Sequence, residues 1–256
     1  MNIELNYKRF VKYLQAYVKR EGIDKLLAWF EKASDVATAP ASTKYHLSCE
    51  GGLIRHSLNV FLRLIKILDM EYPKKFKGND SEGKEIWEET CPYSKETIAI
   101  VALLHDISKV NYYKKVFKNV QNQETGIWEK VPSYVVRDES ERINYGSHEE
   151  NSVYMLTQFI KLTYEEQLAI RYHMGTLDST ESFAQNRIMT AYKLSPLALL
   201  LHMADMEAMC IDEDTDGNFC DKAEELNRVQ KPEETVDKNE PDTTKADRES
   251  EDEAPF

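Results

Sequence analysis

The chain has 256 residues, and 41 % of them are hydrophobic, which is enough to bury one sizeable core. Its formal net charge is −12, but half of that charge lies in residues 229–256, which hold ten acidic and four basic residues. The rest of the chain is only mildly acidic. Composition therefore argues against a broad nucleic-acid-binding surface, which would require clustered lysine and arginine.

The four cysteines are scattered and form no CxxC pair, a spacing typical of reduced thiols inside a cell. No run approaches the roughly 20 apolar residues of a membrane span, and the first residues lack the apolar core of a signal peptide. We therefore expect a cytoplasmic protein with no membrane partner. The low glycine and proline content, nine and eight residues, predicts a largely helical fold.

Amphipathic helices are predicted at the N-terminus. Apolar residues three and four apart indicate two of them within residues 4–34, which we interpret as packing helices of an N-terminal unit over residues 1–42. A longer helical stripe follows over residues 53–70, with His56 near its start.

The next helix is predicted to be the central one. Residues 71–93 before it are polar, and we interpret them as a connection because they include Pro73, Gly78, Gly83 and Pro92. Ser94 is a good N-cap for a helix that contains the strongly apolar run IAIVALL. A helix this apolar should lie buried, and it ends at His105 and Asp106.

Residues 111–137 leave the helical pattern. Apolar and polar residues alternate on both sides of the turn-like stretch NQETG, which predicts a β-hairpin. Helical periodicity returns in SHEENSVYMLTQFIK, TYEEQLAIRYH and SPLALLLHMADMEAM, the last with Ser195 as N-cap and Pro196 as first helical residue. We place the main domain at residues 43–227 and expect a disordered acidic tail over residues 228–256.

Five of the six histidines lie in or beside these apolar helices, where an imidazole loses its hydration, and two aspartates are placed similarly. Metal coordination would recover that cost. Imidazole nitrogens and carboxylate oxygens together suit a transition metal such as Mn, Fe, Co, Ni or Zn. In chain order the candidate ligands are His56, His105, Asp106, His148, His173 and Asp205.

The adjacent pair His105–Asp106 needs a particular local geometry. Neighbouring residues on a regular helix point about 100° apart, so both can reach one ion only near a helix end or a kink. The predicted end of the central helix meets that condition. An HD dipeptide alone is weak evidence, because it occurs by chance in many proteins, and this pair gains weight from the other candidate ligands around it.

The ordered set His56, His105–Asp106 and Asp205 resembles the HD-domain superfamily of metal-dependent phosphohydrolases. The segments GGLIRHSLNV, HDISK, GSH, RYHMG and LHMAD are similar to the HD domain of bacterial 3′-to-5′ exoribonucleases of the YhaM type. The resemblance covers roughly residues 43–212, and it departs from the family pattern HDxGK at Ser108. It implies an all-α HD-domain helical bundle into which the hairpin at about 111–137 is inserted.

The resemblance also implies a metal site. In that family the ordered set holds one divalent metal, and some members add two histidines that hold a second. Here it assigns the first metal to His56, His105, Asp106 and Asp205, and the second to Asp106, His148 and His173. His148 and His173 could instead support ligands or contact substrate. Asp106 would serve both metals, and a metal-activated water would attack phosphorus.

We therefore expect a metal-dependent phosphohydrolase, with one or two divalent metals, that cleaves a nucleotide or a related phosphate ester. Lys109, one turn beyond the pair, would neutralise charge on the phosphoryl oxygens, or it would only cap its helix. The enzymatic alternative is an exonuclease that acts from 3′ to 5′ on short single strands. The alternative of another class is a non-catalytic metal-containing module that senses nucleotides.

The hairpin is the candidate for substrate specificity, because aromatic and basic residues interleave in it. The expected substrate contacts are Lys109, Tyr113, Lys114 and Arg137. A hairpin with one packed and one solvated face would explain the same pattern.

Two histidines and one acidic stretch remain. His202, three residues before Asp205, could support that ligand, but packing is the simpler interpretation. His46 lies before the GG turn and could touch substrate, but a loop position is the simpler interpretation. The stretch DEDTDGNF imitates half of a calcium loop; Ala223 stands where the bidentate glutamate is needed, so we interpret it as a solvated turn.

Overall fold

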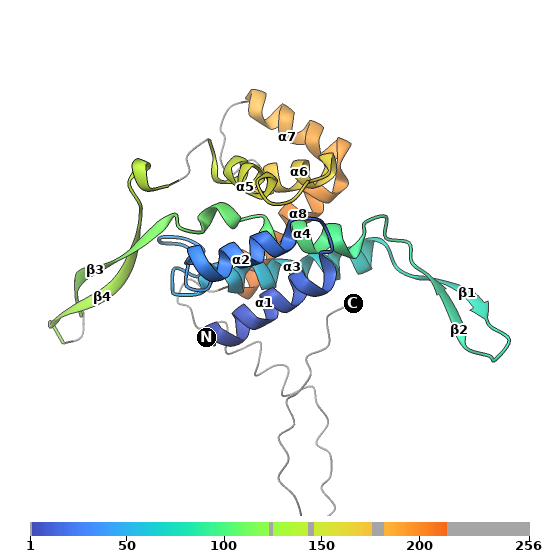
Figure 1. Cartoon of the computed structure of the whole chain (residues 1–256), viewed down its shortest axis with the longest axis horizontal. Coiled ribbons are helices and arrows are strands. Elements are labelled where there is room, and N and C mark those ends of the chain that lie inside the picture. The colour runs from blue at the N-terminus through green and yellow to red at the C-terminus, as the bar shows by residue number, and fades with distance from the viewer. Residues whose placement is uncertain (1, 123–124, 143–145, 176–181, 214–256) are drawn as a thin grey trace, which may run out of the picture.

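The structure is a computed structural model that describes residues 2–122, 125–142, 146–175 and 182–213. The predicted acidic tail and most of DEDTDGNF lie outside the described residues. Helices dominate the described part, and its strands form two small antiparallel sheets (Figure 1).

Three helices form the middle of the fold: α3 (Gly52–Glu71), α4 (Lys95–Leu104) and α8 (Pro196–Glu207). α3 packs against both α4 and α8. Their apolar residues meet in one core, in which Leu64, Leu103 and Leu201 are almost completely buried. The core therefore lies between the helices that also carry several of the candidate ligands.

Two of the predicted helix starts are present. Ser94 caps α4, since its Oγ accepts a hydrogen bond of 3.0 Å from the backbone N–H of Thr97. α8 begins at Pro196, whose fixed φ suits a first helical residue.

The N-terminal helices α1 (Ile3–Tyr17) and α2 (Ile23–Ala33) extend this core. The rings of Phe10 and Phe30 lie 5.9 Å apart and belong to the same hydrophobic cluster as α3 and α4. α1 also packs against α3 and α4. The N-terminal segment thus shares one core with the rest of the described chain.

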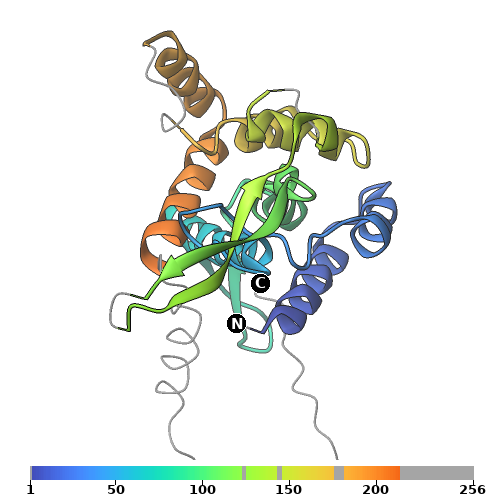
Figure 2. The same ribbon diagram turned by 90° about the vertical axis from the view of Figure 1, so that its left-hand side faces the viewer.

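α5 (His148–Thr157), α6 (Tyr164–Arg171) and α7 (Ser182–Leu194) lie on one side of the central helices (Figures 1 and 2). α5 and α6, which helical periodicity predicts, each begin with a capping box. α7 was not predicted. Its buried stripe is short, Ile188 and Ala191 with Tyr192 beside them, and the exposed Met189 and Leu194 blur the pattern in the sequence.

Two hairpins project from opposite ends of the molecule (Figure 1). β3 (Tyr113–Gln121) pairs with β4 (Trp128–Val136) and forms the predicted one. β1 (Lys75–Asn79) pairs with β2 (Glu85–Glu88), so the interpretation of residues 71–93 as a plain connection was wrong. Nearly all side chains of β1 and β2 are exposed, and no alternation of apolar and polar residues can therefore reveal these strands.

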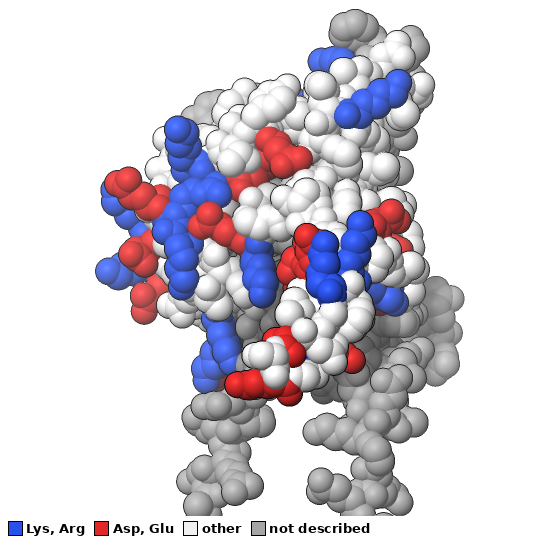
Figure 3. Space-filling model, turned by 90° about the vertical axis from the view of Figure 1, so that its right-hand side faces the viewer, with Lys and Arg blue, Asp and Glu red and all other residues white. Residues whose placement is uncertain are grey.

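Charge is mixed rather than segregated on the side from which β1 and β2 project. Basic and acidic side chains are interspersed over that face (Figure 3). Among the described residues, no single helix has the length and apolar composition to cross a membrane; 185–194 and 196–212 pass that test only as a bent pair. Cys49, Cys91 and Cys210 form no disulfide.

Candidate metal centre

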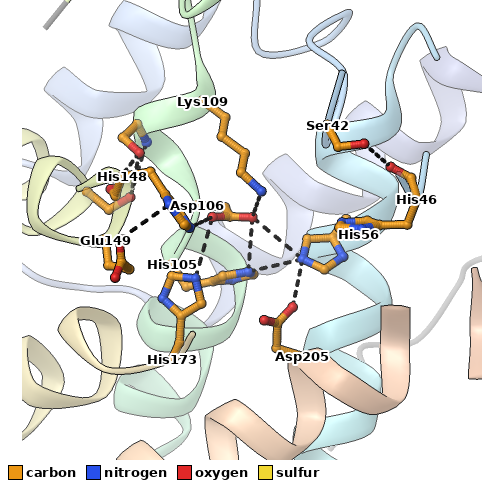
Figure 4. A network of polar contacts seen from close by, with 12 residues as sticks. Ser42, His46, His56, His105, Asp106, Lys109, His148, Glu149, His173 and Asp205 are labelled. Atoms are coloured by element: carbon orange, nitrogen blue, oxygen red, sulfur yellow. Dashed lines mark hydrogen bonds and ion pairs between the residues drawn. The ribbon is translucent and has the colours of Figure 1, made fainter. Parts of the chain in front are cut away.

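The candidate ligands come from five separate places in the fold and meet at one point (Figure 4). His56 lies in the second turn of α3, and Asp205 lies in the last turn of α8. His105 follows the last residue of α4, and His148 is the first residue of α5. His173 comes two residues after α6 ends. Helix ends thus bring polar side chains to the middle of an apolar bundle.

The HD pair has the geometry that the sequence required. His105 keeps helical dihedral angles, but Asp106 has φ −104° and ψ 18°, and a short 3₁₀ helix (Ile107–Lys109) follows. This change of direction at the end of α4 lets adjacent side chains face the same point. Both side chains are almost completely buried.

Asp106 stands at the centre of two groups of three ligands. The first group is His56, His105 and Asp106, and the second is Asp106, His148 and His173. In each group one ligand atom per residue lies within 4.8 Å of the others, which is close enough for a shared ion. Buried histidine and aspartate groups that could hold a metal are therefore present.

The two carboxylate oxygens of Asp106 face different groups of ligands. Oδ2 is 3.5 Å from His105 Nε2 and 3.6 Å from His56 Nε2. Oδ1 is 3.6 Å from both His148 Nε2 and His173 Nε2. Asp205 joins the first group, because its Oδ1 lies 3.0 Å from His56 Nε2. The arrangement has the same two sets of residues as the assignment from the family resemblance.

Three atoms of the second group are buried without any hydrogen bond in the described part of the chain: Asp106 Oδ1, His148 Nε2 and His173 Nε2. An unsatisfied buried polar atom costs about 1–3 kcal/mol, so three that face one another call for a common partner. A single cation can satisfy a carboxylate oxygen and two imidazole nitrogens together.

The other ring nitrogen of His105 and of His173 is occupied, and that of His148 faces a carboxylate. His105 Nδ1 lies 2.9 Å from the Ala102 carbonyl oxygen, and His173 Nδ1 lies 2.7 Å from that of Ile170. The Glu149 carboxylate lies 3.3 Å from His148 Nδ1. Protein metal sites commonly fix the ligand nitrogen of histidine in this way. The Nε2 atoms are therefore left for the centre.

Lys109 lies against the centre. Its Nζ donates a hydrogen bond of 2.6 Å to Asp106 Oδ2. Burial would raise the pKa of Asp106, but Lys109 and His105 outweigh it and hold that pKa well below its usual range. Burial would likewise lower the pKa of Lys109, and Asp106 raises it. Without a metal, the lysine thus supplies positive charge to the shared carboxylate.

Glu213 is a residue of the site that the sequence did not reveal. It is 6 % exposed, and both of its carboxylate oxygens lie 3.1 Å from His56 Nδ1. Asn59 Nδ2 donates a further hydrogen bond of 2.9 Å to it. Burial would lower the pKa of His56, but Glu213 and Asp205 raise it to about 10. Nothing in the sequence of the acidic stretch around residue 213 distinguishes this one glutamate from the other acidic residues there.

Ser108, where the family pattern has glycine, joins two parts of the site. Its Oγ donates a hydrogen bond of 2.7 Å to the carbonyl oxygen of His148, and Ser152 Oγ donates one of 3.0 Å to Ser108 Oγ. The Ser108 hydroxyl therefore fastens the turn after Asp106 to the start of α5.

A cavity of about 430 Å³ opens onto the centre. Of the predicted substrate contacts, Lys109 and Tyr113 line it. Lys114 and Arg137 do not: Lys114 pairs with Asp138 at 3.1 Å, and Arg137 Nε donates to the Tyr113 carbonyl oxygen. Successive residues of a strand point to opposite faces, so Lys114 cannot share the face of Tyr113.

The two remaining histidines differ in their surroundings. His202 Nδ1 lies 2.6 Å from the His173 carbonyl oxygen, and its ring stacks on Tyr192. It therefore supports the backbone of a ligand rather than Asp205. His46 lines the cavity and lies beside His56, with 4.8 Å between their ring centroids.

Comparisons with known proteins return no relative. No family model, no curated protein and no solved structure matches the chain. Its function has to be argued from the centre and the cavity.

Proposed function

We propose that this protein is a metal-dependent phosphohydrolase that cleaves a nucleotide or a related phosphate ester. The observation that carries the proposal is the convergence of Asp106 Oδ1, His148 Nε2 and His173 Nε2, three buried atoms without hydrogen bonds. The order of candidate ligands along the chain, which resembles that of HD-domain phosphohydrolases, supports the same reaction class.

The residues of the centre would divide the chemistry between them. A divalent transition metal held by these residues would lower the pKa of a water molecule and stabilise negative charge on the phosphoryl group. The occupied Nδ1 atoms keep the imidazoles in one orientation and leave Nε2 for coordination. Lys109 lines the cavity beside Asp106, and its ammonium is placed to donate to a phosphoryl oxygen.

The cavity suits a small ester with one phosphate. Its volume of about 430 Å³ lies in the range of small-molecule sites, about 300–1,000 Å³. Among the described residues that line it, Lys109 is the only lysine or arginine, so one phosphate finds a cationic partner. Tyr45, Tyr112 and Tyr113 also line it, and their rings offer surfaces on which a base can stack.

The test begins with the metal. The protein is stripped with a chelator, reconstituted separately with manganese, iron, cobalt, nickel and zinc, and assayed against an aryl phosphate and a panel of nucleotides. We expect bound transition metal in the isolated protein and hydrolysis that depends on it. Asp106→Ala should lose both metal and activity, because each group of ligands includes this carboxylate.

The control variant is Asp138→Ala, which removes an exposed carboxylate that pairs with Lys114. It should keep the metal content and the turnover of the wild type. Unchanged turnover in Asp106→Ala, or no metal in the wild type and no gain on reconstitution, would refute the proposal.

One observation favours the exonuclease alternative. The strand register places Tyr113, Lys115, Phe117, Trp128, Lys130 and Val136 on one face of the β3–β4 hairpin. Tyr113 and Val136 line the cavity, and Phe117 and Trp128 farther out are each 65 % exposed. Exposed aromatic rings interleaved with lysine are the surface on which single-stranded nucleic acid stacks. The cavity end of this face is at Tyr113 and Val136, and Phe117 and Trp128 lie farther along the strands.

The chain supplies a matched control for this second candidate. Phe76 and Trp87 are paired across β1 and β2, exposed by 53 % and 51 %, on the hairpin at the opposite end of the molecule. If a single strand is the substrate, Phe117→Ala with Trp128→Ala weakens oligonucleotide binding at least tenfold, and Phe76→Ala with Trp87→Ala leaves it unchanged. Equal binding by both variants would exclude the exonuclease.

A further inference from the structure

His46 is a buried histidine that belongs to neither group of ligands around Asp106. Its side chain is 12 % exposed, and neither Nδ1 nor Nε2 has a hydrogen-bond partner in the described part of the chain. The nearest carboxylate oxygen, Oε2 of Glu213, is 3.9 Å from Nε2, which is too far for a hydrogen bond. A neutral imidazole always carries one N–H, and burying it without a partner costs about 1–3 kcal/mol.

The loop that carries His46 is held in place by its own hydrogen bonds. Ser42 Oγ donates to the His46 carbonyl oxygen at 2.8 Å and accepts from the Tyr45 N–H at 2.9 Å. Ala41 N–H donates to the Leu47 carbonyl oxygen at 3.2 Å. These hydrogen bonds fix the backbone that carries the His46 ring, although the ring itself makes no hydrogen bond in the described part of the chain.

The start of α3 fits closely against the same loop. A Cβ at Gly52 would lie 2.1 Å from the Leu47 carbonyl oxygen, so only glycine allows this approach. Leu47 itself has φ +43°, a left-handed conformation that is costly for a leucine. Both features keep the backbone next to His46 where it is.

His46 faces the space that a substrate would occupy. It lines the same cavity as Asp106 and Lys109. Figure 4 places it beside His56, on the side of Asp106 opposite His148. A ligand that extends from the centre into this part of the cavity therefore meets the His46 ring.

We propose that His46 is a substrate-contacting residue, whose neutral imidazole donates a hydrogen bond to an oxygen of the phosphate ester bound at the centre. The inference rests on the proposed function and adds a contact residue to it. An oxygen acceptor fits because one ring nitrogen needs an acceptor, and Glu213 is already engaged by His56 and Asn59. The other ring nitrogen can accept from a hydroxyl group of the organic part.

A third metal is the competing explanation for the same residues. Ligand atoms of His46, His56 and Glu213 lie within 4.8 Å of one another. A cation there would need His56 Nδ1, and it would break the contact between that nitrogen and both Glu213 oxygens. The Nε2 atom of the same ring already faces the first group of ligands, so a cation there would make one imidazole serve two metals. We therefore favour a substrate oxygen over a cation, and metal stoichiometry distinguishes the two.

The experiment compares His46→Leu, which keeps bulk without a donor, with His46→Gln, whose amide restores an N–H. Both should keep the metal content and thermal stability of the wild type. We expect the kcat/KM of His46→Leu for a nucleoside monophosphate to fall at least tenfold, and His46→Gln to recover part of that loss. One metal fewer per chain in His46→Leu would overturn the proposal in favour of a third metal site.

A second readout needs no turnover. The histidine ring resonances of the zinc-loaded protein are followed by NMR while inorganic phosphate is added, and the resonance missing in His46→Gln identifies His46. We expect that resonance to shift, and that of His202, which lies outside the cavity lining, to stay. An unmoved His46 resonance overturns the proposal. A shift in a protein that hydrolyses no phosphate ester supports the contact and refutes only the proposed reaction.

Discussion

At the scale of single residues, the centre depends on the Asp106 carboxylate, whose two oxygens have different surroundings. Asp106 Oδ2 has Lys109 as a donor, whereas Oδ1 has no hydrogen bond in the described part of the chain. Lys109 therefore holds the oxygen that faces His56 and His105, whereas the oxygen that faces His148 and His173 is free for a metal. A metal in the first group would have to share Oδ2 with the lysine or displace it.

Glu213 is predicted to set the metal affinity of the first group. Glu213→Gln keeps the shape but removes the charge that orients His56 Nδ1. Loss of such a supporting contact typically weakens metal binding about 10–100-fold. A competition titration against a chromogenic chelator measures the change.

The control for this variant is Glu207→Gln. Glu207 pairs with Arg63 at 3.3 Å in the neighbouring turn and does not touch a ligand. It should bind metal as the wild type does. Wild-type affinity in Glu213→Gln would show that the carboxylate does not support the centre.

The sequence predicted which polar residues the fold brings together, because their apolar surroundings mark them in the chain. Residues of the set His56, His105, Asp106, His148, His173 and Asp205 are brought together by the fold, and the surrounding apolar helices had singled them out. Glu213 could not be found this way. It contacts a residue 157 positions away, and it lies in an acidic stretch in which no sequence pattern singles it out.

At the scale of elements, a buried ion pair fastens the turn between α1 and α2 to α6. Arg20 donates to both oxygens of Glu166, at 2.6 and 3.1 Å, and to Glu96 at 3.1 Å. Glu166 is fully buried, and Thr97 donates a further hydrogen bond to it. Elements from three parts of the chain meet at this one carboxylate.

Removal of the arginine should destabilise the fold strongly. Arg20→Met leaves the Glu166 carboxylate buried without its cation, which typically costs about 3–5 kcal/mol. Urea denaturation followed by circular dichroism measures the free energy of unfolding. Lys8→Met, which breaks the exposed pair with Glu4, is the control and should change stability little. Equal small effects in both variants would contradict the prediction.

Helices and strands could be predicted where the burial of one face gives the sequence a helical or an alternating pattern of apolar residues. The stripe at residues 53–70 became α3, and the alternation at 111–137 became β3 and β4. The hairpin of β1 and β2 stayed hidden because its side chains are exposed on both faces, and its Phe76–Trp87 pair is a contact that only the folded register creates. α7 stayed hidden because its apolar stripe is short and exposed apolar residues, Met189 and Leu194, interrupt the pattern.

At the scale of the whole molecule, metal binding should stabilise the fold. The ligands lie on α3, α4, α5 and α8 and after α6, so a metal would link elements that must separate on unfolding. A ligand present at 100 times its dissociation constant adds about 2.7 kcal/mol. We expect chelation to lower the Tm and reconstitution to restore it. Asp106→Ala should show no such difference; an equal response in that variant would contradict the prediction.

The stability of the metal-free protein should be greatest near pH 6.5. Burial lowers the pKa of His148 to about 3 and of His46 to about 4, so on acidification the unfolded chain takes up protons there first, and stability falls below pH 6.5. The pKa of His56 is raised to about 10, so the folded state loses that proton later than the unfolded chain, and stability also falls from pH 6.5 towards pH 10.

Urea denaturation of the chelated protein between pH 4 and pH 10 measures this profile. Each of these groups contributes a slope of about 1.4 kcal/mol per pH unit where only one state is protonated. Bound metal keeps His56 deprotonated in the folded state, so the alkaline decline should disappear in the reconstituted protein. A stability that rises steadily up to pH 9 without metal would contradict the assignment.

The contact between His56 and Glu213 has a consequence for the order of events in biosynthesis. The ribosome adds Glu213 157 positions after His56, so the emerging chain carries the histidine long before the carboxylate that supports it. Contacts this distant in sequence form late in folding, since a long loop must first close. Tight metal capture by the group that includes His56 is therefore expected late in folding, after the group of Asp106, His148 and His173 has assembled.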